Sequence, residues 1–177
     1  MIVGLPASEF VVLDVETTGL EPERGHEVIE VGAQKLRGRA VIGEYVRLVK
    51  PSKPVPPESL AVHGITDSEL EQGRDPAEVF PALAHFIGPS IIIAHNAAFD
   101  LGFVNAHLER LGLPILKNQA IDTLEIAQRY LILPSYRLGN VAAYLKVPQP
   151  SAHRALVDVI TTREVFFKLI ERAKQKV

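Results

Sequence analysis

The first part of the chain carries short apolar runs separated by polar turns, a pattern that is typical of β-strands. Residues 10–15 have the sequence FVVLDV, an apolar and β-branched run that a single Asp interrupts. Residues 27–33 and 40–49 are two further strand candidates, and Gly38 lies between them as a turn residue. Because these connections are short, we expect a three-strand antiparallel meander. Four prolines in residues 51–57 predict an irregular surface connection.

Helical spacing replaces the strand pattern from residue 75 onward. Asp75 and Pro76 have the character of a helix N-cap and first helical position, and Pro81 is expected to make the first turns irregular. Residues 90–94 (SIIIA) predict a short buried strand, and residues 97–111 carry the apolar stripe of a helix. The same spacing indicates three further helical segments, at residues 121–131, 137–145 and 156–170.

These elements predict an α/β fold. A three-strand antiparallel meander, followed by helices that alternate with further strands, favours one sheet of mixed direction flanked by helices. The length of 177 residues suits one domain, and no internal repeat or long linker divides the sequence. We therefore expect a single domain over residues 1–177.

Composition narrows the class of protein. With 47% hydrophobic and 23% charged residues the chain is not disordered, and the lack of cysteine excludes a disulfide scaffold, a thiolate metal site and a cysteine nucleophile. No apolar run reaches the roughly 18 residues of a membrane span. The first residues also lack the basic stretch of a signal peptide, so we expect a cytoplasmic protein without a membrane partner. A formal net charge of −2 argues against a protein that coats nucleic acid electrostatically.

Two carboxylates break the apolar pattern of the first strand. Asp14 interrupts the run, and Glu16 follows two positions later. Side chains at positions i and i+2 of a strand point to the same face, with Cα atoms about 6.5 Å apart. Like charges so placed repel each other, which favours a functional role for the pair. The structural alternative is that both are solvated residues at a strand end.

Asp100 is a third carboxylate in an unexpected place. It closely follows the apolar strand expected at residues 90–94 and lies beside the apolar stripe of the next helix. Ligands of open α/β sheets bind at the carboxyl ends of strands, which is where this position falls. The structural alternative is an acidic residue that complements the dipole of a helix N-terminus.

His153 and Asp158 form the last candidate group. They are five residues apart, which corresponds to about 140° around a helix if both are helical. They can serve one site only if His153 precedes the last helix and Asp158 lies inside it. Three other histidines, His26, His85 and His107, are expected to lie at the surface.

Four carboxylates that converge on one site require cations, because their mutual repulsion is otherwise strongly unfavourable. Oxygen ligands select hard cations, Mg²⁺ or Mn²⁺. Two such ions about 4 Å apart activate a water and stabilise the leaving oxygen in phosphodiester cleavage. Histidine, with a usual pKa of about 6.5, is suited to take the proton of that water. The residue set therefore predicts metal-assisted phosphodiester hydrolysis with two divalent ions as cofactors.

The motifs around these residues resemble those of the DEDDh group of 3′–5′ exonucleases. This is the DnaQ-like family with a ribonuclease-H-like fold, to which the proofreading epsilon subunit of bacterial DNA polymerase III belongs. The three motifs are residues 13–20 (LDVETTGL), 95–100 (HNAAFD) and 153–158 (HRALVD). Residues 62–67 (VHGITD) are also similar to proofreading-type members. The motifs occur in order and extend over most of the chain.

The resemblance implies a role for each catalytic residue. Asp14, Glu16 and Asp158 would ligate the more tightly held metal ion. Asp14 would also bridge to the second ion, which Asp100 would reach directly or through water. His153 would be the general base.

The resemblance also implies a pocket for the 3′-terminal nucleotide, formed by Thr17, Thr18, Leu20, His63, Asn96 and Phe99. The two threonines would hold the nucleotide through backbone and side-chain atoms, and Leu20 would wedge between the last two bases. The other three residues each have a structural alternative: Phe99 as a core residue, His63 as a capped-loop residue, and Asn96 as a helix cap.

The implied activity is a metal-dependent 3′–5′ exonuclease that acts on single-stranded DNA or frayed 3′ ends and releases nucleoside 5′-monophosphates. A DNA polymerase is then a candidate partner, for proofreading. The same machinery would suit RNA ends, as in an oligoribonuclease, because the choice rests on contacts to the 2′-hydroxyl. A noncatalytic polymerase-associated binding subunit is the alternative from another class, and the presence of all five catalytic residues weighs against it.

Overall fold

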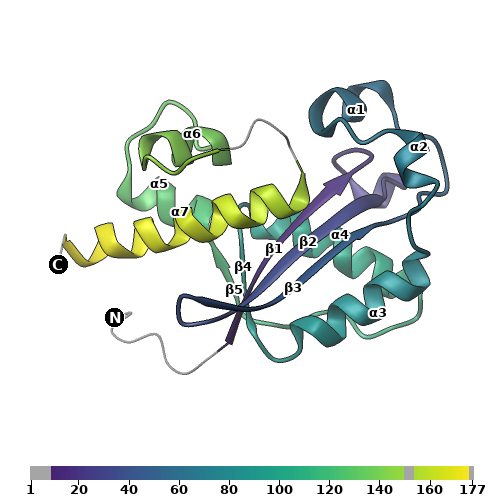
Figure 1. The fold of residues 1–177 in the computed structure, drawn as a ribbon, viewed down its shortest axis with the longest axis horizontal. Helices are drawn as coiled ribbons and strands as arrows, with labels where there is room; N and C mark the ends of the chain where they lie inside the picture. Colours follow the sequence, from purple (N-terminus) through teal and green to yellow (C-terminus); the bar gives the residue numbers. More distant parts are fainter. Residues whose placement is uncertain (1–8, 150–153, 176–177) are drawn as a thin grey trace.

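A five-stranded sheet forms the centre of the computed structural model, which describes residues 9–149 and 154–175 (Figure 1). The strand order is β3-β2-β1-β4-β5. The strands are β1 (Glu9–Thr17), β2 (Val28–Arg37), β3 (Ala40–Leu48), β4 (Ile91–Ala94) and β5 (Ala120–Asp122). The first three form the expected antiparallel meander, whereas β4 and β5 run parallel to β1. The mixed α/β sheet is thus confirmed, with β1 as its central strand.

Helices cover both faces of the sheet. α3 (Pro76–Ile87) and α4 (Ala97–Arg110) pack on one face, and α7 (Ala155–Gln175) crosses the other (Figure 1). The shorter helices are η1 (Pro22–Arg24), α1 (Pro57–His63), α2 (Asp67–Leu70), α5 (Thr123–Tyr130) and α6 (Leu138–Tyr144). Both α5 and α6 share an apolar cluster with α7. A bilayer-spanning segment is not found among the helices of the described residues.

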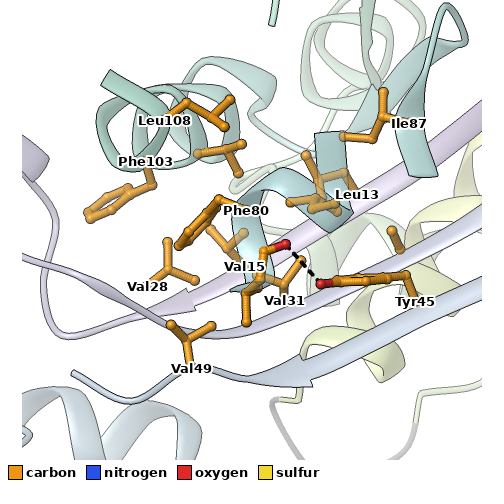
Figure 2. Close-up of a cluster of buried hydrophobic side chains, with 14 of the residues drawn as sticks. Leu13, Val15, Val28, Val31, Tyr45, Val49, Phe80, Ile87, Phe103 and Leu108 are labelled. Carbon is orange, nitrogen blue, oxygen red and sulfur yellow. Dashed lines mark hydrogen bonds between the residues drawn. The ribbon is translucent and has the colours of Figure 1, made fainter. Parts of the chain in front are cut away.

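Alternation along β1 decides which side chains each helical layer covers. Leu13 and Val15 point into the cluster that packs against α3 and α4 (Figure 2). In the same cluster the Tyr45 hydroxyl donates a hydrogen bond to the Val79 carbonyl at 2.9 Å, which gives a buried polar atom its partner. Phe10, on the other face of β1, packs against α7. Even-numbered positions of β1 therefore face α7.

Three local features differ from the sequence pattern. Residues 120–122 form β5 by pairing with β4, so the helix expected at 121–131 begins only at Thr123. The pattern gives no sign of α1 or α2, because both are shorter than the window that reveals a helical period. The expected irregularity at Pro81 is wrong, since α3 continues through it with its apolar face held in the core.

His107 is buried rather than at the surface, where the sequence alone placed it. Its Nε2 accepts a hydrogen bond from the Val28 backbone N–H at 3.1 Å, and its ring stacks on Phe80 at 4.2 Å between centroids. Burial, together with the charge of Arg110, lowers the pKa of His107 to about 4. The neutral imidazole thus joins α4 to the first residue of β2 by a hydrogen bond. The apolar spacing of α4 does not predict this contact.

Candidate active site

Asp14 and Glu16 extend from the face of β1 that α7 covers. They follow Phe10 and Val12 in the strand alternation, so all four side chains point to the same side of the sheet. Asp158 lies in the first turn of α7, which starts close to the carboxyl end of β1 (Figure 1). Carboxylate oxygens of Asp14, Glu16 and Asp158 all lie within 4.8 Å of one another. We call these three residues the carboxylate group.

Asp100 reaches the same strand from α4. It is buried, and its Oδ1 accepts a hydrogen bond from the Val15 backbone N–H at 3.1 Å. β4 pairs with β1 only as far as Val12, so Asp100 supplies a backbone partner where β1 has run beyond β4. Its carboxylate is therefore held at the strand between Asp14 and Glu16, next to the carboxylate group but outside it.

The clustered carboxylates raise one another's pKa values. For Asp14 burial is the largest cause, and the charges of Asp100 and Asp158 follow. Burial raises the pKa of Glu16 to about 8, with the charges of Asp158 and Glu30 adding to it. Burial also raises the pKa of Asp100, against the opposing effect of the Val15 N–H bond. Each proton retained at neutral pH is one that a bound cation could replace.

The donor set of the carboxylate group fits a divalent cation. All its donors are hard carboxylate oxygens, which Mg²⁺ and Mn²⁺ prefer, and the chain contains no cysteine. Three partly buried acids within 4.8 Å of one another are a costly arrangement without a compensating positive charge. The carboxylate group can therefore hold a metal ion.

The end of β1 and the turn that follows it hold the first three predicted nucleotide contacts, Thr17, Thr18 and Leu20. The Thr17 hydroxyl donates to the Gly19 carbonyl at 2.6 Å, and the Thr18 hydroxyl accepts from the Glu27 N–H at 2.9 Å. Leu20 projects from this turn with 76% of its surface exposed. The two hydroxyls thus shape the turn that presents Leu20.

A groove of about 620 Å³ opens between α1, the start of α4, α5 and the segment before α6. Two of the predicted nucleotide contacts, Asn96 and Phe99, line it, and Val62 of α1 adds an apolar side chain that is 62% exposed. Gln128 of α5 and Arg137, directly before α6, provide polar groups on its other side. The groove therefore combines apolar surface with a few polar and charged groups, as ligand sites do.

Asn96 does not cap α4 with its side chain, so the structural alternative proposed for it is wrong. Asp122 does so instead: its two carboxylate oxygens accept hydrogen bonds from the N–H groups of Asn96 and Ala97, both at 2.9 Å. Asn96 has φ of 74°, a left-handed conformation that costs a non-glycine residue about 1 kcal/mol. The Asp122 carboxylate holds this conformation and leaves the Asn96 side chain at the groove.

Phe99 and His63 both make structural contacts, and of the two only Phe99 lines the groove. Phe99 packs against the core with its ring centroid 4.9 Å from that of Phe103, and it also lines the groove. His63 is buried, and its Nδ1 accepts a hydrogen bond from the Ile65 N–H at 2.9 Å. Its Nε2 has no hydrogen-bond partner among the described residues. Because Nδ1 is the acceptor and burial lowers the pKa of His63, the neutral ring carries its hydrogen on Nε2, as an unused donor.

The family of the chain is decided by comparison with known proteins. Residues 11–166 match the family model described as Exonuclease, RNase_T. The chain belongs to this exonuclease family. The relationship expected from the three motifs is thus confirmed.

Curated relatives of this exonuclease domain are far longer than the chain. It is 40% identical over 166 residues to the PolC-type DNA polymerase III of Thermotoga maritima, covering 94% of this chain and 12% of that protein. It is 34% identical over 170 residues to the PolC-type enzyme of Halalkalibacterium halodurans, covering 96% of this chain and again 12% of the relative. The chain thus spans about one eighth of the length of these curated relatives.

Solved structures of exonucleases share the fold of this domain. Exonuclease X, in complex with 5′ overhanging duplex DNA, aligns with a TM-score of 0.74, 24% identity and 93% coverage of each chain. E. coli exonuclease I, in complex with a dA16 oligonucleotide, aligns with a TM-score of 0.82 and 22% identity, over 96% of this chain and 42% of that one. These likenesses confirm the ribonuclease-H-like sheet.

The predicted general base of the exonuclease domain, His153, lies outside the described residues, so its role stays a prediction.

The sequence pattern assigned no role to two residues that build the site. His95 bonds the Thr123 hydroxyl at 2.9 Å and the Tyr136 carbonyl at 2.8 Å, which ties the end of β4 to α5 and to the far side of the groove. Glu30 is buried in β2, where it breaks an apolar run as Asp14 does in β1. That break was the signal that could have found Glu30.

Proposed function

We propose that this chain is the catalytic domain of a metal-dependent 3′–5′ exonuclease. The observation that carries the proposal is the carboxylate group, Asp14, Glu16 and Asp158, with Asp100 beside it. Membership of the exonuclease family supports this chemistry. Burial and neighbouring negative charges raise the pKa values of Asp14, Glu16 and Asp100, and such an arrangement suits the binding of cations.

In this proposal the carboxylate group holds one divalent ion, and Asp14 together with Asp100 holds a second. Bound Mg²⁺ or Mn²⁺ ions supply the activation of a water and the stabilisation of the leaving oxygen. The Val15 N–H fixes the orientation of the Asp100 carboxylate before a ligand arrives. His153, at the position of the family's histidine, takes the proton of the attacking water.

The groove is the proposed site of the 3′-terminal nucleotide. Exposed Leu20 and Val62 offer apolar contacts to bases, and Phe99 offers an aromatic ring. Such contacts accept every base, because each base has a π-face, and a nonspecific exonuclease needs that tolerance. Asn96 lines the groove, and its amide is proposed to meet sugar and phosphate oxygens. The Nε2 of His63 is buried in the free protein, so its proposed contact requires that the bound nucleotide expose it.

DNA is the proposed substrate, as single strands or frayed 3′ ends, with nucleoside 5′-monophosphates as products. Support comes from the relatives, which are named as DNA polymerases, and from the structures of exonucleases X and I with DNA bound. The same relatives support a DNA polymerase as the partner and proofreading as the role. The domain is proposed to extend over residues 1–177 as one unit.

The test is the digestion of matched DNA and RNA strands that carry a label at either the 5′ or the 3′ end, with Mn²⁺ or with EDTA. We expect 5′-labelled DNA to shorten stepwise and the 3′ label to leave first as a mononucleotide, in Mn²⁺ alone. Early release of a 5′ label, or equal cleavage in EDTA, would contradict the proposed reaction. Faster digestion of the RNA strand than of the matched DNA strand would show that RNA is the preferred substrate.

A further inference from the structure

Arg154 connects three elements at the start of α7. Its Nε donates to the Glu30 Oε2 at 3.1 Å and its Nη2 to the Glu30 Oε1 at 2.7 Å, in a bidentate ion pair with β2. Its Nη1 lies 3.5 Å from the Glu69 carboxylate of α2. Glu30 also accepts a hydrogen bond from the Ala155 N–H at 2.8 Å, so one carboxylate both pairs with Arg154 and caps α7.

The Glu30 interaction is the strong one of the two. Glu30 is only 3% exposed, and an ionised carboxylate that deeply buried requires its positive partner. Glu16 lies directly opposite Glu30 in the β1–β2 register, on the same face of the sheet. Like charges directly opposite each other destabilise a strand pair, so Arg154 is needed at this point. The Glu69 carboxylate is partly exposed and more distant, and such pairs contribute little.

Gly32 provides a second fixed point for the start of α7. A Cβ atom at Gly32 would lie 2.6 Å from the Ala155 carbonyl carbon, so the first turn of the helix rests directly on the backbone of β2. Gly32 is two residues from Glu30 and opposite Asp14 in the strand register. The first turn of α7 is thus bound by Glu30 and seated at Gly32.

Asp158 is one helical turn beyond Arg154. Its N–H donates to the Arg154 carbonyl at 3.0 Å, which makes the two residues consecutive points of one rigid turn. Any shift of Arg154 relative to β2 therefore moves Asp158 relative to Asp14 and Glu16, which stand on β1.

We propose that Arg154 is a positioning residue, which sets the Asp158 carboxylate at metal-binding distance from Asp14 and Glu16 by fixing the start of α7 to Glu30. This inference rests on the proposed function of the carboxylate group as a metal site. The Glu69 contact extends the same connection to the segment of α1 and α2 that carries Val62 and His63.

Arg163, inside α7, is a matched control for Arg154, which directly precedes that helix. It also joins α7 to a buried side chain of β2, donating to the Gln34 amide oxygen at 2.7 Å. It lies nine residues beyond Arg154, about 13 Å along the helix. Substituting either arginine therefore removes one contact between α7 and β2, but only one of them is next to Asp158.

The experiment compares Arg154→Gln, Arg154→Lys and Arg163→Gln in the whole chain, by calorimetric titration with Mn²⁺ in the absence of DNA and by thermal unfolding. We expect both Arg154 variants to bind Mn²⁺ about 10- to 100-fold more weakly than the wild type, as lost support of metal ligands does. Arg163→Gln should lower Tm without changing Mn²⁺ affinity. Arg154→Lys retains the charge and keeps the test valid if Arg154→Gln fails to fold.

The sign of the change separates positioning from simple charge. Removing a positive charge close to the site would strengthen cation binding in Arg154→Gln, whereas loss of positioning weakens it. Unchanged or tighter Mn²⁺ binding in the folded Arg154 variants would overturn the positioning role of Arg154. That result would not contradict the proposed exonuclease function, which is tested separately on the wild type. Wild-type protein that binds Mn²⁺ but digests no DNA would instead remove the proposed function and leave the positioning role standing. A wild type that binds no Mn²⁺ would overturn both.

Discussion

At the scale of single residues, the site consists of acids that the surrounding protein makes costly to ionise. Burial and neighbouring charges raise the pKa of Glu16 to about 8, and the pKa of Asp14 rises for the same reasons. In the metal-free protein the folded state holds these protons over a range in which the unfolded chain has released them. The contribution of Glu16 to the free energy of unfolding of the metal-free protein is therefore present at low pH and is lost as pH rises toward about 8.

Metal binding should strengthen with pH over the same range. Below pH 8 a cation must displace the Glu16 proton, whereas above it the carboxylate is already free. We expect the increase in Tm caused by a fixed Mn²⁺ concentration to grow from pH 6 to pH 8 and then level off. Differential scanning fluorimetry at several pH values measures this directly. A Tm increase that is the same at pH 6 and pH 8 would show that protons and Mn²⁺ do not compete.

His107, which is not part of the carboxylate group, gives the opposite pH dependence. Its pKa of about 4 in the folded state lies below the usual value near 6.5, so the unfolded chain binds the extra proton first. Stability contributed by the neutral ring is complete above pH 6.5 and is lost as pH falls toward 4, by up to about 3 kcal/mol.

The variant His107→Gln isolates this effect, because glutamine can accept the Val28 N–H bond but does not titrate. We expect the wild type to lose more unfolding free energy than the variant between pH 7 and pH 4.5, in urea denaturation. Both proteins keep the carboxylate group, so its pH dependence cancels in the difference. A difference that stays constant with pH would contradict the buried neutral histidine.

At the scale of elements, the groove is assembled from segments far apart in the chain. Asp122 at the end of β5 holds the backbone of Asn96, and His95 holds the carbonyl of Tyr136. Hydrogen bonds therefore join β4, β5 and the segment before α6, and they place Arg137 at the groove. Its guanidinium adds positive charge to the groove, which suits a contact with a phosphate of the substrate strand.

Arg137→Gln should weaken the binding of substrate rather than its conversion. We expect KM for a single-stranded DNA oligonucleotide to rise several-fold with kcat nearly unchanged, since an exposed phosphate contact adds affinity but not chemistry. Raising the salt concentration should shrink the gap from the wild type, because such contacts are screened. Arg129→Gln, on the exposed side of α5, is the matched control and should leave KM unchanged. A fall in kcat with an unchanged KM would rule out the phosphate role.

The sequence indicates elements best where their pattern is long. The apolar stripe of residues 97–111 predicts α4 closely, and the acid that interrupts FVVLDV predicts the centre of the site. β5 escapes detection because three residues are too few for a period, and only pairing with β4 makes them a strand. The Asp122 cap is missed for a similar reason, since Asn96 is an equally good cap by residue type and only the folded chain shows which acts.

At the scale of the whole molecule, the central strand of the sheet is also the strand that carries the chemistry. β1 pairs with β2 along its whole length and with β4 as far as Val12, and helices cover both of its faces, so Asp14 and Glu16 stand just beyond the point where β4 ends. α4 brings Asp100 to this strand from one layer, and α7 brings Asp158 from the other. The order of the motifs does not reveal this convergence, which follows from the crossing of two helices over one strand.

The net charge of −2 is a poor guide to the partner of such a molecule. Four of its acidic residues gather at one site, where two bound divalent cations would neutralise the local negative charge and present positive ions to an anionic strand. The affinity of the metal-free protein for nucleic acid is accordingly expected to be low. The formal charge thus describes the whole surface and not the groove.

The variant Asp14→Ala tests the catalytic centre most directly. It is assayed on 5′-labelled single-stranded DNA with Mn²⁺, alongside the wild type. The control is Glu125→Gln, which removes an exposed acid of α5. We predict stepwise shortening by the wild type and by Glu125→Gln, and no detectable product from Asp14→Ala. The Asp14→Ala protein should remain folded, with a metal-free Tm equal to or above that of the wild type, because one of several repelling carboxylates is gone. Exonuclease activity retained by folded Asp14→Ala would contradict the assignment of the carboxylate group as the catalytic centre.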